Sequence, residues 1–359
     1  MSDLHTLEAA AGRYVDPLLG ASLADAGVTL RSVEGQDAPQ LQVTLGFPAA
    51  GYRSALAAAL RAHLAEALPG VKVDVQIDWQ VTAQSVKQGL AALPGVKNVI
   101  AVASGKGGVG KSTVAVNLAL ALAAEGAQAG ILDADIYGPS QPRMLGCSDR
   151  PSSPDGKKMY PMRAHGLQAM SIGFLTDETQ PMVWRGPMAT QALAQLFGET
   201  QWEALDYLVV DLPPGTGDIQ LSLAQRIPVS GAVIVTTPQD IALLDARKGL
   251  EMFRKVSVPV LGVVENMSVH ICSNCGHHEA IFGEGGGERL AAETGVVVLG
   301  RLPLDIRIRE QTDGGNPTVA AEPESENALI YRDIARRVAA RLAYGTPAND
   351  FPTIEIADD

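Results

Sequence analysis

The chain has 359 residues, with 40 acidic and 28 basic side chains and a formal net charge of −12 at neutral pH. This length exceeds what one small core usually organises, so we expect one large domain and a smaller one. The acidic balance argues against a protein whose main partner is a nucleic acid, because that function needs a surplus of Lys and Arg.

Neither a targeting signal nor a membrane span is expected. The opening, MSDLHTLEAA, lacks the basic and apolar regions of a secretory signal, and the longest apolar stretch, 114–124, is too short to cross a bilayer. We therefore expect a cytoplasmic protein with no membrane partner.

Three cysteines are too few for a disulfide framework, and two of them form the sequence CSNC at 272–275. This pair needs an explanation of its own.

The first 80 residues predict a small α+β domain. A helical opening leads to an apolar run at 41–45, then to a helix from Tyr52 with leucines at helical spacing. The alternating run at 71–78 predicts a strand with one buried face. Residues 81–97 lose this pattern and end in Leu-Pro-Gly, which indicates a linker.

Residues 98–345 predict an α/β domain. Short apolar, β-branched runs alternate with helical stretches, at 99–103, 130–133, 207–212, 232–236, 260–264 and 296–299. This alternation is typical of a mainly parallel sheet that helices cover on both faces. An amphipathic helix, roughly 327–342, closes the domain, and residues 346–359 form a polar, acidic tail.

A glycine-rich loop carries the strongest functional signal. The strand at 98–104 runs directly into GKGGVGKST at 105–113 and then into a helix. In this context the loop N–H groups surround a phosphate, the helix N-terminus adds its positive end, and Lys111 reaches the β and γ oxygens. We expect an ATP site with Mg²⁺ on Ser112. Its residues are Gly105, Lys106, Gly107, Gly108, Val109, Gly110, Lys111, Ser112 and Thr113.

A second lysine and three aspartates complete the predicted chemistry. Lys106 is not needed by an ordinary phosphate loop; it either neutralises charge growing on the phosphates, often from across a dimer interface, or is a solvated loop lysine. Asp133 and Asp135 lie at a strand end, where a carboxylate can orient the attacking water and hold Mg²⁺ through water; we expect Asp133 among the nucleotide-binding residues, and Asp135 is our candidate to orient the water. Asp211 ends another strand and is expected in the magnesium shell. Alternatively, each aspartate has only a structural role and caps the end of its strand.

Taken together, the motifs resemble the Mrp family of iron–sulfur carrier ATPases, related to the ParA, MinD and nitrogenase iron protein group of two-lysine P-loop proteins. The resemblance covers nearly all of residues 98–337, and residues 1–78 are similar to a small domain found in iron–sulfur assembly. The stretches that carry it are SGKGGVGKST at 104–113, DADIYGPS at 133–140, VWRGPM at 183–188, DYLVVDLPPGTGD at 206–218, ENM at 265–267, CSNCG at 272–276 and IFGEGGG at 281–287.

The resemblance implies a homodimer that binds ATP between or near its subunits, holds a labile iron–sulfur cluster and passes it to apoproteins, with assembly factors as further partners. It gives Lys106 the role of a signature lysine that acts across the interface. Asn266 matches the position that recognises adenine, and residues 213–218 match a switch that senses the γ-phosphate. The cluster ligands it implies are Cys272 and Cys275.

The cysteine pair itself allows three interpretations. A four-iron cluster takes four thiolates, so Cys272 and Cys275 fit one only if two chains meet there, with the cluster on the dimer axis. Zinc with His277 and His278 makes a poor tetrahedral cage within one chain, whereas zinc bridging two chains stays an alternative. A redox disulfide lacks thioredoxin-like surroundings. Cys147 is isolated and is expected to be a packing residue.

The favoured function is slow ATP hydrolysis that gates cluster loading or release. One alternative is a spatial organiser like the MinD and ParA proteins, which need a basic amphipathic helix or a basic surface, whereas this tail ends in IEIADD. Another alternative is a targeting ATPase in which zinc bound to the cysteine pair holds the two subunits of the dimer together.

Overall fold

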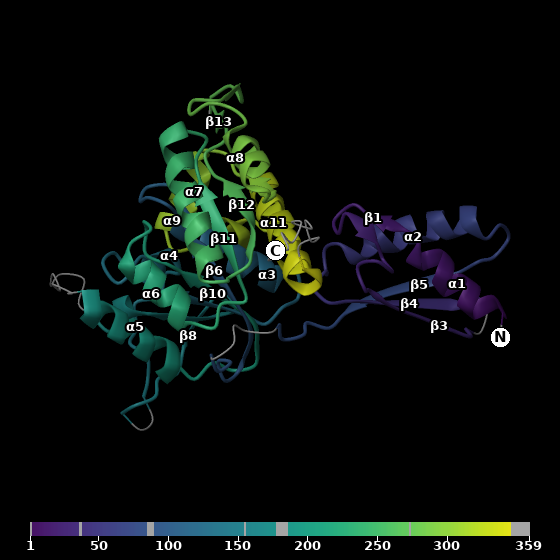
Figure 1. Ribbon diagram of the computed structural model, residues 1–359, viewed down its shortest axis with the longest axis horizontal. Helices are drawn as coiled ribbons and strands as arrows, with labels where there is room; N and C mark the ends of the chain where they lie inside the picture. Colours follow the sequence, from purple (N-terminus) through teal and green to yellow (C-terminus); the bar gives the residue numbers. More distant parts are fainter. Residues whose placement is uncertain are drawn as a thin grey trace, which may run out of the picture.

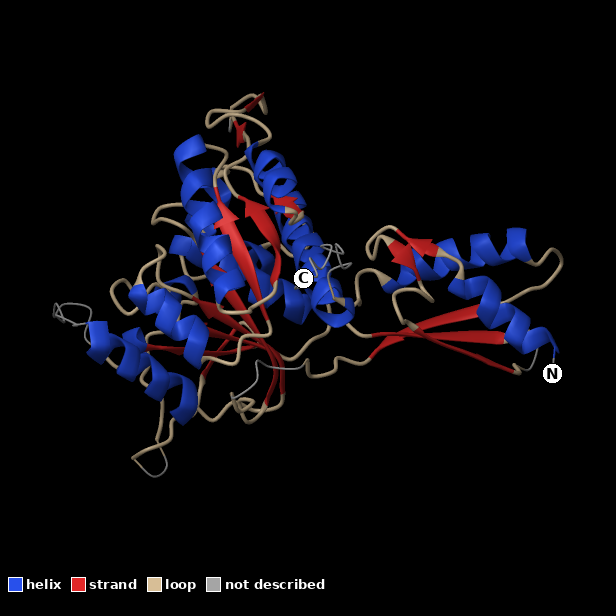
Figure 2. Cartoon of the chain, viewed as in Figure 1, coloured by secondary structure: helices blue, strands red, loops and turns tan. Residues whose placement is uncertain are grey.

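The computed structural model describes residues 2–35, 38–84, 90–153, 156–176, 186–272 and 274–345. These residues form a large α/β part and a small α+β part, which lies to the right in Figures 1 and 2. The predicted fold class is therefore confirmed. The predicted tail, 346–359, and Ser273 of the CSNC sequence lie outside the described residues.

The small part is a three-stranded sheet with two helices on one face. Its elements are α1 (Ser2–Gly12), β1 (Val15–Asp16), β2 (Ala21–Ser22), β3 (Thr29–Val33), β4 (Gln40–Leu45), α2 (Arg53–Ala67) and β5 (Asp74–Trp79). The order is β3-β4-β5, with β4 antiparallel to β3 and parallel to β5. β5 begins three residues later than predicted, because its pairing with β4 begins at Asp74, opposite Gln40, with the N–H of Asp74 donating to the Pro39 carbonyl at 3.0 Å.

The large part is an eight-stranded sheet in the order β15-β12-β11-β6-β10-β7-β9-β8, parallel except for β8. Its elements are β6 (Val96–Ala103), α3 (Lys111–Ala124), β7 (Ala129–Asp133), α4 (Gln141–Met144), β8 (Met162–Ala164), β9 (Leu167–Ser171), a short 3₁₀ turn (Ile172–Phe174), α5 (Gly186–Glu199), β10 (Leu205–Asp211), α6 (Asp218–Arg226), β11 (Gly231–Thr236), α7 (Asp240–Lys255), β12 (Val260–Glu265), β13 (His270–Ile271), β14 (His278–Glu279), α8 (Gly286–Thr294), β15 (Val298–Arg301), α9 (Ile306–Asp313), α10 (Thr318–Ala321) and α11 (Glu326–Tyr344). In the part of the chain that is described, no helix combines the length and apolar character needed to cross a bilayer.

All six predicted strands of this sheet are present, and each differs from its predicted range by one to three residues at one or both ends. β6 begins at Val96, which pairs with Leu205 of β10, so the last two residues of the predicted linker belong to the sheet. Gly95 ends the connector, and its carbonyl accepts the N–H of Leu205 at 2.7 Å. Strands β8 and β9 were not predicted.

The chain order reverses at β6. From β6 the chain moves through α3 to β7, whereas β11, β12 and β15 extend the sheet in the opposite direction through α7 and α8. Right-handed crossovers that run in opposite directions put their helices on opposite faces, so α3 lies on one face and α7 and α8 lie on the other. Ligands bind at the carboxyl ends of strands where such a sheet reverses its order, which here is the end of β6.

The small part packs against the far end of α3. Glu125, which follows α3, is fully buried; its Oε2 accepts the N–H of Gly51 at 2.8 Å, and its Oε1 pairs with Arg332 Nε of α11 at 2.9 Å. A Cβ at Gly51 would lie 2.7 Å from the Glu125 carboxylate. Nearby, the Tyr344 hydroxyl oxygen accepts the N–H of Gly46 at 2.7 Å. One buried carboxylate thus joins the loop before α2 to the helix that begins at the phosphate loop.

Replacing Glu125 with glutamine is expected to weaken this contact by about 3 kcal/mol, because it leaves a mostly buried arginine without its buried charged partner. The loss is measured as a lower melting temperature and as faster hydrogen exchange at the N–H of Gly51. The matched control is Glu324→Gln, since Glu324 lies 3.5 Å from the same Arg332 but is exposed. Its expected effect is below about 1 kcal/mol, and equal losses in the two variants would contradict a role for burial.

Candidate functional site

The phosphate loop is held from two sides. A Cβ on Gly105 would lie 2.2 Å from the backbone carbonyl carbon of Asp245 in α7. Gly110 has φ 81°, and a Cβ there would lie 2.2 Å from Asn266 Nδ2 at the end of β12. Glycine is therefore required at both positions. Because α3 begins at Lys111, the positive end of this helix lies at the loop, where an anionic phosphate is favoured.

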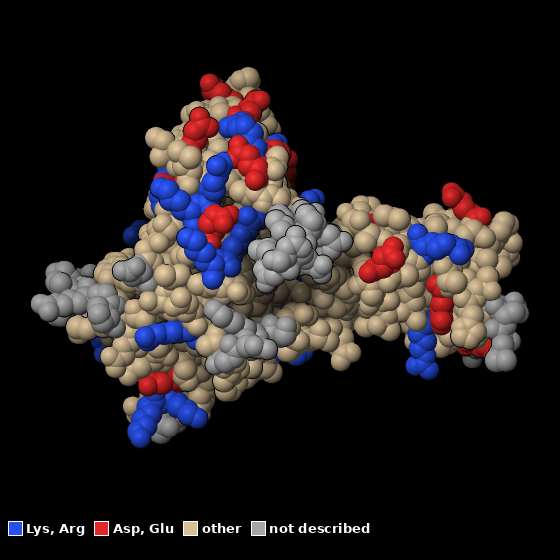
Figure 3. Space-filling view, viewed as in Figure 1, with Lys and Arg blue, Asp and Glu red and all other residues tan. Residues whose placement is uncertain are grey.

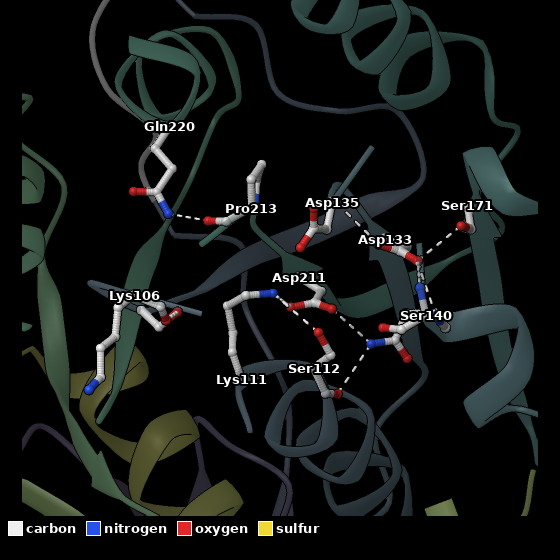
Figure 4. A network of polar contacts seen from close by, with 12 residues as sticks. Lys106, Lys111, Ser112, Asp133, Asp135, Ser140, Ser171, Asp211, Pro213 and Gln220 are labelled. Carbon is white, nitrogen blue, oxygen red and sulfur yellow. Dashed lines mark hydrogen bonds and ion pairs between the residues drawn. The ribbon is translucent and has the colours of Figure 1, made fainter. Parts of the chain in front are cut away.

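Lys111 lies at the centre of the site. Its Nζ forms an ion pair with Asp211 Oδ1 and lies 3.2 Å from Ser112 Oγ (Figure 4). The lysine is 5% exposed and the aspartate is fully buried, so this is a dry contact between β10 and the start of α3. Carboxylate and hydroxyl oxygens are ligands that Mg²⁺ takes. The structure thus brings both predicted magnesium ligands, Ser112 and Asp211, next to the predicted phosphate lysine.

Asp133 contacts the chain that follows it. Its Oδ2 accepts the N–H of Ser140 at 3.0 Å, the N–H of Gln141 at 3.1 Å and the hydroxyl of Ser171 at 3.0 Å, and its Oδ1 accepts the N–H of Asp135. Burial, and secondly the charge of Asp211, raises the pKa of Asp133 to about 7. The carboxylate therefore fixes the chain reversal between β7 and α4.

Asp135 lies beside the predicted switch loop. It lines a cavity of about 460 Å³ together with Tyr137, Pro213, Pro214 and Gln220. Burial raises the pKa of Asp135, and the nearby Lys111 ammonium opposes that shift. In Figure 4 Asp135 lies between Pro213 and Asp133, above Asp211. A water in this cavity would have a carboxylate acceptor within reach.

Lys106 and Asn266 are placed differently from the central cluster. The Lys106 side chain runs away from Lys111 and Asp211 in Figure 4, and among the described residues it makes no ion pair. Asn266 is 8% exposed, and its Nδ2 donates to the Val109 carbonyl at 2.8 Å. Asn266 therefore supports the loop directly, a contact that its predicted role in adenine recognition did not include.

Cys272 and Cys275 lie in the connection between β13 and β14, at the top of Figure 1. The N–H of Cys272 donates to the His277 carbonyl at 2.9 Å, and its carbonyl accepts the N–H of Gly276 at 2.8 Å. Cys272 is half-buried and Cys275 is exposed, and both are free thiols. Backbone N–H groups of Asn274 and Cys275 lower the pKa of the Cys272 thiol, which favours the thiolate that binds metals.

A cavity of about 620 Å³ lies between this hairpin and the sheet. Its walls include Ile271 and His278 of the hairpin, and Glu265 and Arg301 at the ends of β12 and β15. Glu265 is buried and accepts the N–H of Gly287, while Arg301 Nε lies 3.5 Å from its other oxygen. The end of β12 therefore contacts the phosphate loop through Asn266 and lines the cavity beside the β13–β14 hairpin through Glu265.

Two site residues were missed by the sequence analysis. Gln141 contacts Asp211 and Ser112 through its side chain, and Ser171, on the unpredicted strand β9, donates to Asp133. No motif marks either position. The segment before Ser171 is Leu-Gln-Ala-Met at 167–170, which has three apolar residues but no β-branched residue to favour a strand.

The fold and the loop together define a nucleotide-binding P-loop protein. A family profile described as ParA, NUBPL iron-transfer P-loop NTPase, matches residues 95–339. The chain belongs to this family, which confirms the predicted resemblance.

Several relatives span most of the chain. It is 56% identical to an iron-sulfur cluster carrier protein of Haemophilus influenzae over 316 residues, which is 88% of this chain and 85% of the relative. It is 55% identical to the iron-sulfur cluster transfer protein NUBPL of mouse over 252 residues, 70% of this chain and 79% of the relative. A solved nucleotide-binding protein of Archaeoglobus fulgidus, in complex with ADP and with cobalt, has 36% identity and a TM-score of 0.57, and covers 65% of this chain and 90% of its own.

Proposed function

We propose that this protein binds and hydrolyses ATP and carries an iron–sulfur cluster to apoproteins. One observation carries the proposal. The α/β part of the fold contains both the cluster of Lys111, Ser112 and Asp211 and a hairpin that presents two free thiols. The names of the relatives in Haemophilus influenzae and mouse, and the ADP in the solved relative, support cluster carriage and nucleotide binding.

The nucleotide roles follow from the contacts. Lys111 is proposed to leave Asp211 and bind the β and γ oxygens, while Ser112 and Asp211 hold Mg²⁺, which neutralises phosphate charge when bound. Asp135 is proposed to orient the attacking water from its cavity. Asn266, fixed against the loop, is proposed to present its remaining amide surface to adenine. Hydrolysis is proposed to be slow in the isolated protein.

The cluster role follows from stoichiometry. Each chain offers Cys272 and Cys275, and a four-iron cluster takes four thiolates, so we propose a homodimer with one cluster bridging two hairpins. The recipients are proposed to be iron–sulfur apoproteins of the cytoplasm, with assembly factors as donors. Glu265 at the end of β12 lines the cavity of about 620 Å³ beside the hairpin, and nucleotide binding is proposed to affect the cysteines through this connection.

Anaerobic reconstitution with iron and sulfide tests the cargo. The wild-type protein is expected to gain visible absorption and about two iron atoms per chain, with the mass of a dimer, because a four-iron cluster is shared. Cys272→Ala and Cys275→Ala are expected to lose both the visible absorption and the bound iron. The matched control is Cys147→Ala, since Cys147 is half-buried near α4 and packs against the core. Zinc in place of iron, or equal iron in all variants, would contradict the carrier function.

A further inference from the structure

Gln141 has an unusual environment. It is the first residue of α4 and is fully buried. Its Nε2 donates to Asp211 Oδ2 at 2.9 Å and lies 3.2 Å from the Ser112 carbonyl oxygen. Its Oε1 is buried and has no hydrogen-bond partner among the described residues. Buried polar atoms are nearly always hydrogen-bonded, so an acceptor without a partner in this place indicates a missing donor.

The same residue lies between two buried carboxylates. Its backbone N–H donates to Asp133 Oδ2 at 3.1 Å, while its side chain donates to Asp211. Lys111 takes the other oxygen of Asp211, so each oxygen of that carboxylate is held by a different donor (Figure 4). When a phosphate draws Lys111 away, the Gln141 amide still fixes the orientation of Asp211.

Resting on the ATP site proposed above, we propose that Gln141 is a positioning residue of the magnesium site. Its Nε2 orients Asp211 toward the cation, and its Oε1 supplies an acceptor for the hydration shell of Mg²⁺. Residues that hydrogen-bond to metal ligands orient those ligands, and removing one such residue typically weakens metal binding or activity by about 10- to 100-fold. A neutral amide suits the position because a carboxylate would add a negative charge beside Asp133 and Asp211 and could not donate.

The test is a Mg²⁺ titration of full-length protein with ADP, followed by calorimetry and by melting temperature. Gln141→Leu is expected to bind ADP in EDTA within about twofold of wild type, but to need about tenfold more Mg²⁺ for half-maximal stabilisation. Gln141→Glu is expected to do the opposite: its nucleotide-free form is less stable because of repulsion from Asp211, and Mg²⁺ stabilises it more than it stabilises wild type.

Gln168→Leu is the matched control. Gln168 is a buried glutamine whose side chain bonds to the backbone of Glu203, at the other end of β9 from Ser171. It is expected to lose stability with no change in Mg²⁺ dependence. If Gln141→Leu behaves like this control, or if Gln141→Glu titrates like wild type, the inference is overturned. Failure of wild type itself to bind ADP would instead contradict the proposed ATP site.

Discussion

Lys111→Ala is expected to lower ATP affinity by about a hundredfold and to abolish every nucleotide-dependent activity. The estimate follows from the loss of charge-assisted hydrogen bonds to phosphate, each worth about 1.5–3 kcal/mol. Isothermal calorimetry with ATP and Mg²⁺ measures the affinity directly. Wild-type affinity in this variant would contradict the assignment of the loop.

The same substitution is expected to destabilise the nucleotide-free protein. Asp211 is fully buried, and Lys111 is the cation paired with it, so alanine leaves a buried carboxylate without its compensating charge, at a cost of about 3 kcal/mol. Chemical denaturation without nucleotide measures this loss.

A second lysine–aspartate pair, which also includes a residue of β10, provides the control. Lys97 Nζ and Asp206 Oδ1 lie 2.9 Å apart and join the amino ends of β6 and β10, far from the phosphate loop, but Lys97 is about half exposed. Lys97→Ala is therefore expected to change stability by about 1 kcal/mol or less and to leave ATP affinity unchanged. Equal destabilisation by Lys97→Ala and Lys111→Ala would mean that burial at the loop has no special role.

The difference between local and distant contacts explains what the sequence could predict. The loop at 105–113 is contiguous, and its chemistry depends on neighbours in the chain, so its residues are readable as a motif. Asp211 was predicted from its strand-end position, but its ion pair with Lys111, 100 residues away, depends on β10 lying next to β6. Strand order is a property of the whole sheet.

The missed residues have the same cause. Gln141 enters the site only because Asp133 bonds to the backbone at 140 and 141 and turns the chain back over the end of β7. Ser171 was missed with its strand, since Leu-Gln-Ala-Met-Ser lacks β-branched residues and is held as β9 by pairing with β7. Tertiary pairing outweighs local propensity at this position.

Lys106→Ala is expected to separate binding from hydrolysis. Lys106 is half-buried, points away from Lys111 and makes no ion pair among the described residues, so ATP affinity should stay within about threefold of wild type. Hydrolysis should fall by about a thousandfold if this lysine neutralises transition-state charge as an arginine finger does. Single-turnover measurement with ATP and Mg²⁺ reports the chemical step, and Lys248→Ala, an exposed lysine of α7, is the control. Unchanged hydrolysis would remove the two-lysine mechanism.

Mixed dimers test whether Lys106 acts on its own subunit or on the partner. Lys106→Ala lacks the lysine, and Asp135→Asn lacks the base proposed to orient water, so each variant alone should be inactive. If the lysine acts across the interface, a dimer of the two variants pairs an intact Asp135 with an intact Lys106 in one of its two sites, and mixing restores part of the activity. If it acts within its own chain, neither site is complete and the mixture stays inactive. Recovery on mixing therefore requires the homodimer as well as the lysine, because a monomeric enzyme has no second subunit to supply the missing charge.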